Sequence, residues 1–244
     1  MKTCVVATLS ALLLTATSAF SATYSAAGNT LPASPFQRFD AGHLGSTLPF
    51  SPYFGQGHSP TPDHSATGGV YFSGQTDQSK YTFWYDPSQT LDAAPGVDIT
   101  ARLRIAASSS VSTNRSGVAI AMTDSDNFYT EVYLGTTEIF INGAGRVRDE
   151  AYAMDTTDGF HDYLVRVAGT DVKVFVDGIL GLESASFDAS TVSAPTLANW
   201  AVLGDITSSA SGAYEMQSFA VAVPEPAAVG LIGVAGLLAM RRKR

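Results

Sequence analysis

Apolar and polar residues alternate along several short stretches of this chain, with the period of two that is typical of a half-buried β-strand. The clearest stretch is 97–105, which has apolar residues at every odd position and polar residues at every even position. No stretch between residues 22 and 222 shows the 3.6-residue period of an amphipathic helix. The pattern therefore predicts a body built of strands.

The same period predicts further strands, separated by turns that are rich in Gly, Asp, Asn and Pro. The expected strands are 70–72, 81–85, 117–123, 128–134, 138–142, 161–167, 172–176, 179–182, 200–203 and 214–223. Asp177-Gly178 favours a two-residue hairpin turn, because both turn positions need a positive φ. Ten or more short strands at this spacing indicate an all-β sandwich or barrel.

Two details of this pattern concern individual faces and loops. In 128–134 we expect Val132 to face the core and Tyr129, Glu131 and Tyr133 to face solvent. The polar stretch 145–159 is expected to be a loop.

Both ends of the chain carry segments that are typical of export. Residues 1–21 have a positive start, an apolar run and small residues at Ala19 and Ser21, which predicts a signal peptide cleaved after Ser21. Its partners would be the Sec translocon and signal peptidase. Near the other end, the apolar run 227–240 precedes four cations that resist transfer across a bilayer. These cations are Arg241, Arg242, Lys243 and Arg244.

The apolar run predicts a short, transient membrane helix with its basic end in the cytoplasm. It has 14 residues, whereas a spanning helix needs about 20, so a buried soluble helix is the alternative. Flanking Arg and Lys stems extend the span by snorkelling.

Pro224, Glu225 and Pro226 stand directly before this run. Together, the motif, the apolar span and the basic end resemble the PEP-CTERM sorting domain of Gram-negative bacteria, over residues 223–244. The resemblance implies an exosortase as partner, cleavage near the Pro-Glu-Pro motif, and delivery to the cell surface or an extracellular matrix.

We expect one domain over residues 22–222. Its charge and its cysteine content limit which partners it can bind and whether it can form a disulfide. Export would remove five of the 14 basic residues and leave all 22 acidic residues up to Glu225, so the exported part carries about −13. This charge disfavours nucleic-acid partners. The only cysteine, Cys4, lies in the signal peptide, so the mature chain has no disulfide.

The order of features between Val97 and Val221 resembles the concanavalin A-like jelly roll, in its laminin-G-like branch. The matching features are the strand 97–105, the segments 116–121 and 126–132, the strand 161–166, the hairpin 174–178 and the closing strand to Val221. The resemblance implies two stacked, curved sheets, with ligands on the concave face or at the rim loops.

Candidate chemistry is sparse. The acidic cluster Glu-x-Asp-x-x-Glu of the glucanases that share this fold is absent, as are nucleophile-elbow and zinc-protease motifs. Asp124, Asp126 and Asn127 supply oxygens that suit calcium, although the same residues favour a plain β-turn. Trp84 offers a face on which a sugar ring could stack, or it belongs to the core.

Two functions follow from these observations. The first is a non-catalytic surface protein that binds or scaffolds exopolysaccharide, for example in a biofilm, with calcium as the only cofactor considered. The alternative is a secreted glycan-active hydrolase or lyase, with a site on the concave face that the sequence does not reveal.

Overall fold

The computed structural model describes residues 19–25, 37–42, 63–64, 70–73, 80–85, 90–125, 129–184, 199–207 and 209–223. Side chains are described for residues 83 and 84 and for every described residue from 90 on, except residue 144. Within these residues, no helix has the length and apolar character needed to cross a bilayer. The strands are β1 (Ala19–Ser25), β2 (Gln37–Gly42), β3 (Asp63–His64), β4 (Val70–Ser73), β5 (Lys80–Tyr85), β6 (Val97–Ser110), β7 (Val118–Thr123), β8 (Tyr129–Leu134), β9 (Glu138–Asn142), β10 (Arg148–Ala153), β11 (His161–Ala168), β12 (Asp171–Val176), β13 (Ile179–Ser184), β14 (Trp200–Asp205) and β15 (Ala210–Val223).

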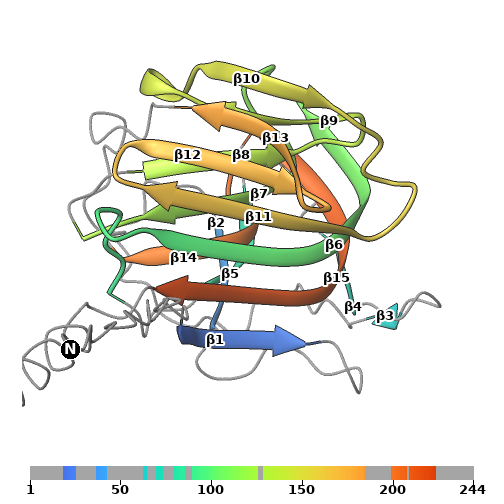
Figure 1. Cartoon of the computed structure of the whole chain (residues 1–244). Coiled ribbons are helices and arrows are strands. Elements are labelled where there is room, and N and C mark those ends of the chain that lie inside the picture. The colour runs from blue at the N-terminus through green and yellow to red at the C-terminus, as the bar shows by residue number, and fades with distance from the viewer. Residues whose placement is uncertain are drawn as a thin grey trace, which may run out of the picture.

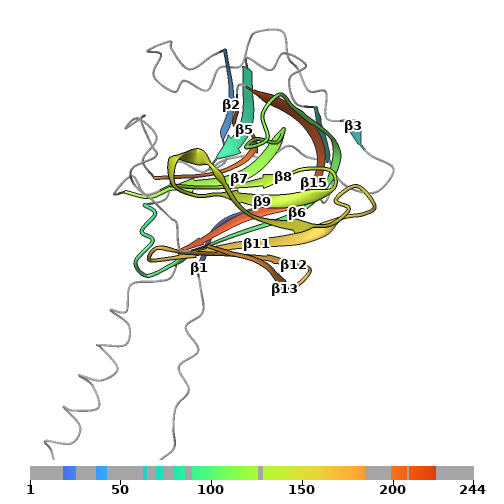
Figure 2. The ribbon, with the colours of Figure 1, turned by 90° about the horizontal axis from the view of Figure 1, so that it is seen from above.

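These strands form two antiparallel sheets (Figure 1). The eight-stranded sheet has the order β13-β12-β11-β6-β15-β4-β3, and β1 also pairs with β15. The seven-stranded sheet has the order β10-β9-β8-β7-β14-β5-β2. Figure 2 shows the sheets as layers, with β8 and β9 in one layer and β11, β12 and β13 in the other. The fold is an all-β, jelly-roll-like sandwich, which confirms the predicted class.

The strand with the clearest alternation, β6, lies in the middle of the eight-stranded sheet. Its odd positions from Val97 to Ile105 are buried and its even positions are half-buried, as predicted. The strand continues to Ser110, beyond the expected end at residue 105. Ser108–Ser110 pair with Ala210–Gly212 of β15, and the Ser109 and Ser211 hydroxyls lie 3.0 Å apart, so hydrogen bonds and not apolar alternation extend the strand there.

The expected loop 145–159 is the clearest error of the strand prediction, because β10 occupies Arg148–Ala153. Among the described strands it pairs with β9 alone, and its register is irregular between Arg148 and Ala151. An edge strand whose side chains are exposed has no apolar alternation to reveal it. The turn Asp177–Gly178 is confirmed, with φ values of 52° and 80°.

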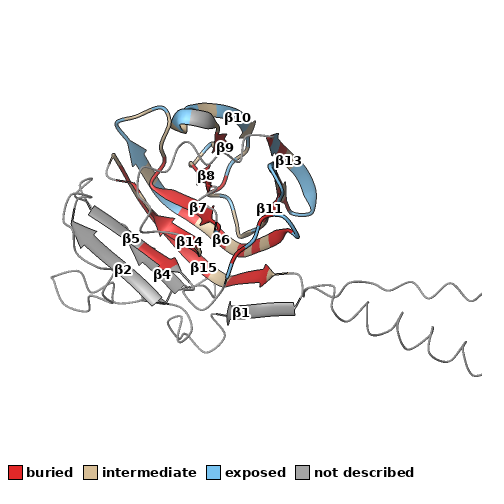
Figure 3. Ribbon diagram, turned by 90° about the vertical axis from the view of Figure 1, so that its left-hand side faces the viewer, coloured by how far each residue is buried: buried red, intermediate tan, exposed pale blue. Residues whose placement is uncertain are grey.

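The main core lies between the two sheets. It contains alternate apolar residues of both, for example Ile99 and Leu103 from β6 and Ile120 and Met122 from β7. Trp84 belongs to this core and is only 4% exposed, so its ring is not presented to a sugar as a stacking platform would be. Figure 3 shows β7, β14 and β15 buried, whereas exposed residues gather on β10 and β13.

The other side chains of β7, β8, β9 and β14 point away from the eight-stranded sheet. We call this side of the seven-stranded sheet its far face. Its apolar residues form two small clusters, separate from the main core, and Ile206 packs against both. The members of these clusters are Phe83, Ala119, Ala121, Tyr129, Tyr133, Phe140, Trp200 and Val202.

The predicted segments at the two ends lie mostly outside the described residues, including the sorting motif Pro224, Glu225 and Pro226 and the basic end. The last three residues of the predicted signal peptide belong to β1, where Ala19 pairs with Val223 of β15.

Candidate functional site

Polar side chains gather on the far face along β8. Tyr129, Glu131 and Tyr133 alternate with the core residues of this strand, as the sequence predicts, but they do not face solvent. Their exposed fractions are 7%, 2% and 0%. The prediction of a solvent-facing side was therefore wrong, because both faces of the central strands are covered.

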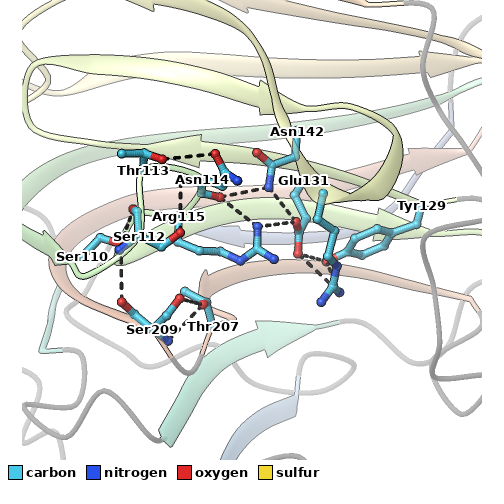
Figure 4. Close-up of polar contacts among 11 residues, drawn as sticks. Ser110, Ser112, Thr113, Asn114, Arg115, Tyr129, Glu131, Asn142, Thr207 and Ser209 are labelled. Carbon is cyan, nitrogen blue, oxygen red and sulfur yellow. Dashed lines mark hydrogen bonds and ion pairs between the residues drawn. The ribbon is translucent and has the colours of Figure 1, made fainter.

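Glu131 is the centre of this group (Figure 4). Its Oε1 accepts a hydrogen bond from the Tyr129 hydroxyl, and its Oε2 accepts one from Asn142 Nδ2 at 3.1 Å. Two guanidinium groups lie at ion-pair distance: Arg146 Nη2 is 3.6 Å from Oε1, and Arg115 Nη1 is 3.8 Å from Oε2. We call Arg115, Tyr129, Glu131, Tyr133, Asn142 and Arg146 the Glu131 cluster.

Arg146 reaches the cluster from the short turn between β9 and β10. Its backbone has a φ of 58°, in the left-handed region that residues other than Gly and Asn rarely adopt. The guanidinium lies 5.2 Å from the centre of the Tyr129 ring, and its Nη2 donates to the Tyr129 hydroxyl at 3.4 Å. Backbone strain of this kind persists where the surrounding contacts require it, and it gathers at functional sites.

Arg115 comes from the loop between β6 and β7. Its Nη1 donates to the carbonyl of Asn114 at 2.8 Å, and the same carbonyl accepts from Asn142 Nδ2 at 3.0 Å. The guanidinium lies 5.7 Å from the centre of the Tyr133 ring. The backbone bond from Val111 N–H to the carbonyl of Ser209 fastens this loop to the chain before β15 at 3.0 Å. The loop therefore holds Arg115 in a defined position.

A second ion pair borders the cluster. It joins one cation to one carboxylate, so it carries no net charge. Arg148 pairs with Glu138, and its guanidinium lies 4.5 Å from the centre of the Phe140 ring. Phe140 stacks on Tyr133 at 5.3 Å. Within the Glu131 cluster, by contrast, two guanidinium groups share one carboxylate, which leaves a local charge of about +1. This excess lies within a strongly acidic protein, so it favours an anionic ligand at this place.

Several polar atoms of the cluster have unused hydrogen-bonding capacity. Tyr133 Oη, Asn142 Oδ1 and Arg146 Nε are buried and have no hydrogen-bond partner in the part of the chain that the structure describes. Buried polar groups normally have partners, so these exceptions need an explanation, such as a bound water, an ion or a ligand. The Arg146 side chain is 40% exposed and that of Arg115 is 16% exposed, so the cluster meets solvent on its cationic side.

Both tyrosines hold their protons at neutral pH. Burial raises the pKa of Tyr129 well above its usual value, and the neighbouring Glu131 carboxylate raises it further. The same two causes raise the pKa of Tyr133. Each hydroxyl is therefore a proton donor, and Tyr129 can pass its proton along an existing hydrogen bond to Glu131.

The residues that the sequence suggested for calcium binding and sugar stacking do not belong to this cluster. Asp124 is buried, and its carbonyl accepts from Asn199 N–H at 3.4 Å; Asp126 and Asn127 lie outside the described residues. Among the residues that are described, no group of three His, Cys, Asp or Glu side chains could hold a metal ion. Trp84 lies in the main core, on the opposite side of the sheet from Glu131.

One feature of the sequence pointed to the cluster, but it was interpreted as a solvent-facing surface. Tyr, Glu and Tyr at alternate positions of a strand give a polar face, which is normal at a surface but costly in a buried strand unless the groups are paired. Arg115 and Arg146 carried no signal, because each comes from a loop 15 or 16 residues away from Glu131.

No family model matches this chain, and no curated protein matches it either. Among solved structures, it is similar to a carbohydrate esterase from the Shiga toxin-encoding bacteriophage phi24B, with 14% identity and a TM-score of 0.54 over 86% of this chain and 100% of that one. It also matches alginate lyase A1-II′ of family 7 in complex with substrate, with 10% identity and a TM-score of 0.46 over 70% of this chain and 84% of that one. Alginate lyase AlgAT5 of polysaccharide lyase family 7 has 16% identity and a TM-score of 0.41, over 64% of this chain and 79% of that one.

The likeness to the carbohydrate esterase describes the fold, and it goes against our first hypothesis. A non-catalytic scaffold was expected because the sequence holds no known catalytic motif. The similar structures include a carbohydrate esterase, so the absence of a familiar motif did not justify that hypothesis. We withdraw it.

Proposed function

We propose that this protein is an enzyme that acts on an acidic polysaccharide and that its active site is the Glu131 cluster. The observation that carries the proposal is the unequal charge of the cluster: Arg115 and Arg146 both approach the single carboxylate of Glu131, at 3.8 and 3.6 Å. The remaining positive charge suits the carboxylate of a uronate sugar. The neighbouring uncharged polar atoms suit its hydroxyl groups.

The geometry favours elimination over hydrolysis. Hydrolysis of a glycosidic bond uses two carboxyl groups about 5–9.5 Å apart. Glu131 lies opposite Asn142 on β9, and Glu138 stands four residues further along β9, which is roughly 13 Å at about 3.3 Å per residue. Glu138 is also paired with Arg148. Among the described residues of the cluster, Glu131 is the only carboxylate.

Elimination needs groups that the cluster does contain. The two guanidinium groups would neutralise the uronate carboxylate, which makes the hydrogen on the adjacent carbon, C5, more acidic. Tyr129 would take this hydrogen as a proton while its own proton passes to Glu131. The C4–O bond then breaks as a double bond forms between C4 and C5, and the departing oxygen takes a proton from Tyr133.

The test is an assay of the purified protein against uronate-containing and neutral polysaccharides, followed by the ultraviolet absorbance of the new double bond. We expect activity on uronate polymers only, and a loss of at least about 100-fold in Glu131→Gln, within the range that general acid–base groups contribute. Arg166→Ala is the control, because Arg166 is an exposed partner of Asp98 on the other sheet. Reducing sugar without absorbance would indicate hydrolysis, and equal activity of Glu131→Gln would place the site elsewhere.

We also propose that the protein is exported by a signal peptide and sorted by an exosortase, as a concanavalin A-like domain delivered to the cell surface or released outside the cell. What supports this is the tripartite end of the sequence, from Pro224 to Arg244, together with the apolar start. Mass spectrometry of the mature protein from its native host tests it. We expect an amino-terminus near Ala22 and no residues from the basic end; an intact Arg244 on protein in the cytosol would contradict the proposal.

A further inference from the structure

A histidine lies between two carboxylates at the opposite sheet from the Glu131 cluster. His161, the first residue of β11, contacts Asp177 through Nδ1 at 2.8 Å and Asp158 through Nε2 at 2.8 Å. Asp158 belongs to the crossover 154–160 that leads from β10 to β11, and Asp177 belongs to the turn between β12 and β13. Both carboxylates accept hydrogen bonds, so both contacts can form only when both ring nitrogens carry hydrogen.

We propose that Asp158, His161 and Asp177 form a pH-sensitive clasp, which fastens the crossover 154–160 to the β12–β13 hairpin when His161 is protonated and releases it when His161 is neutral.

The two carboxylates are held differently, which determines where the clasp opens. Asp177 Oδ1 also accepts from the backbone N–H of Asp162 at 2.9 Å, and Asp177 N–H donates to the carbonyl of Asp162 at 2.8 Å. Asp158 has a side chain that is 62% exposed and stands in an irregular segment. A neutral imidazole keeps one N–H, which stays with the better-held Asp177. Its other nitrogen then turns a lone pair toward Asp158, which is repelled.

Most charged groups on the neighbouring elements are carboxylates, which favour the protonated ring. Asp155 and Asp158 lie in the crossover, Asp177 in the hairpin turn, and Asp162 beside His161 on β11. On β6, the cation Arg102 lies opposite Asp162, and its charge is shared with that carboxylate through a contact of 2.7 Å. The Tyr163 ring meets the His161 ring edge to face at 6.2 Å, and the pKa of its hydroxyl is raised by burial and by Asp177 and Asp158. Carboxylates therefore outnumber cations around the ring.

The direction of the pH effect follows from these contacts. Burial alone would lower the pKa of His161, but its bonds to Asp177 and Asp158 raise it above the ordinary 6.5. A group with a raised pKa stabilises the fold fully below its ordinary value, and this contribution is lost as the pH rises through the raised value. The clasp is thus closed in mildly acidic solution and opens toward alkaline pH.

The crossover also contacts the sheet that carries the Glu131 cluster. Thr156 N–H donates to the carbonyl of Thr136, and Met154 N–H donates to that of Thr137, both at 3.1 Å. Thr136 and Thr137 lie between β8 and β9. Ile105 N–H of β6 donates to the carbonyl of Thr156 at 3.0 Å, so the crossover links both sheets. Opening of the clasp therefore loosens a segment that braces the turn between two site-bearing strands.

The experiment is a pH titration of the purified protein, read by NMR of the imidazole and by hydrogen exchange. We expect a pKa for His161 above 6.5, and a loss of protection of the Thr156 amide, which bonds to Thr136, across this titration. In Asp158→Asn the pKa falls and the step in protection disappears. The control is Asp171→Asn, an exposed change at the other end of the β11–β12 hairpin. It leaves the pKa of His161 and the step in protection unchanged.

Two results would overturn the clasp. One is an imidazole pKa at or below 6.5 in the unchanged protein. The other is a step in the protection of the Thr156 amide that persists in His161→Gln, since that variant cannot titrate at this position. Neither readout depends on catalysis, so failure of the proposed enzyme activity would leave this test intact.

Discussion

Gly117 and Gly212 bring the two sheets into backbone contact. A Cβ atom added to Gly117 would lie 1.9 Å from the carbonyl oxygen of Ser211, and one added to Gly212 would lie 2.6 Å from the backbone of Gly117. Gly117 directly precedes β7 of the seven-stranded sheet, and Gly212 lies in β15 of the eight-stranded sheet. No side chain fits between them, so the sandwich closes here only because both residues are glycine.

The first prediction concerns this contact. Gly117→Ala should destabilise the fold by at least about 1–3 kcal/mol, as overpacking does in a core, because the obstacle is backbone and cannot rotate away. Urea unfolding followed by circular dichroism measures the effect. The control is Gly159→Ala, where the added methyl group meets nothing within 4 Å. Equal stability of the two variants would contradict the close approach.

The second prediction compares the two tyrosines of the Glu131 cluster. Tyr129→Phe removes a hydroxyl that bonds to Glu131 and Arg146, so it should cost about 1–3 kcal/mol of folding stability. Tyr133→Phe removes a hydroxyl with no partner among the described residues, so stability should be equal or higher. Thermal unfolding separates the two variants.

For activity on a uronate polymer, both tyrosine variants should be impaired. Tyr133→Phe is the more informative of the two, because a fall in activity without a fall in stability assigns its hydroxyl to substrate or to proton transfer. Full activity of Tyr133→Phe would remove Tyr133 from the proposed reaction and leave the rest of the cluster in place.

The third prediction concerns a buried acid. Burial raises the pKa of Asp205 from its ordinary 3.8 to about 8, although its bond from Thr207 N–H opposes the shift. Below pH 3.8 the carboxyl is protonated in both the folded and unfolded states. Between the two values only the unfolded state ionises, so the folded state loses up to about 1.4 kcal/mol per pH unit. Above about 8 the loss is constant.

Asp205→Asn should therefore raise the melting temperature by several degrees at pH 7 and above, and leave it unchanged near pH 3. The amide oxygen can still accept from Thr207 N–H. Asp92→Asn is a matched control, because Asp92 is exposed and its Oδ1 accepts from the N–H two residues later, at 2.9 Å. A melting temperature that responds equally in both variants would contradict the burial of Asp205.

The fourth prediction uses the two tryptophans, which are the only ones in the chain. Trp84 is 4% exposed, and Trp200 is 9% exposed and donates from Nε1 to Thr123 Oγ1 at 2.7 Å. The protein should therefore show blue-shifted fluorescence that acrylamide quenches weakly. Trp84→Ala should cost about 3–5 kcal/mol, as removal of a large core side chain does. Strong quenching by a soluble glycan would instead support a stacking role for Trp84.

Much of the strand arrangement could be predicted from residue patterns, because one-sided burial leaves a local record. β6, β9, β12 and the Asp177–Gly178 turn were found where alternation and turn residues indicated them. β10 left no such record, because an exposed edge strand is held by backbone bonds that any residue can make. The prediction also mistook the second face of β8 for a surface, since alternation shows that two faces differ and not what covers each of them.

The residue pattern alone therefore predicts an all-β protein, with Tyr129, Glu131 and Tyr133 at alternate positions of one strand. Tertiary contacts bury this face and bring Arg115 and Arg146 to Glu131. Alternation along a strand is local, whereas the charge around a buried carboxylate depends on loops that the fold brings together from separate strand ends.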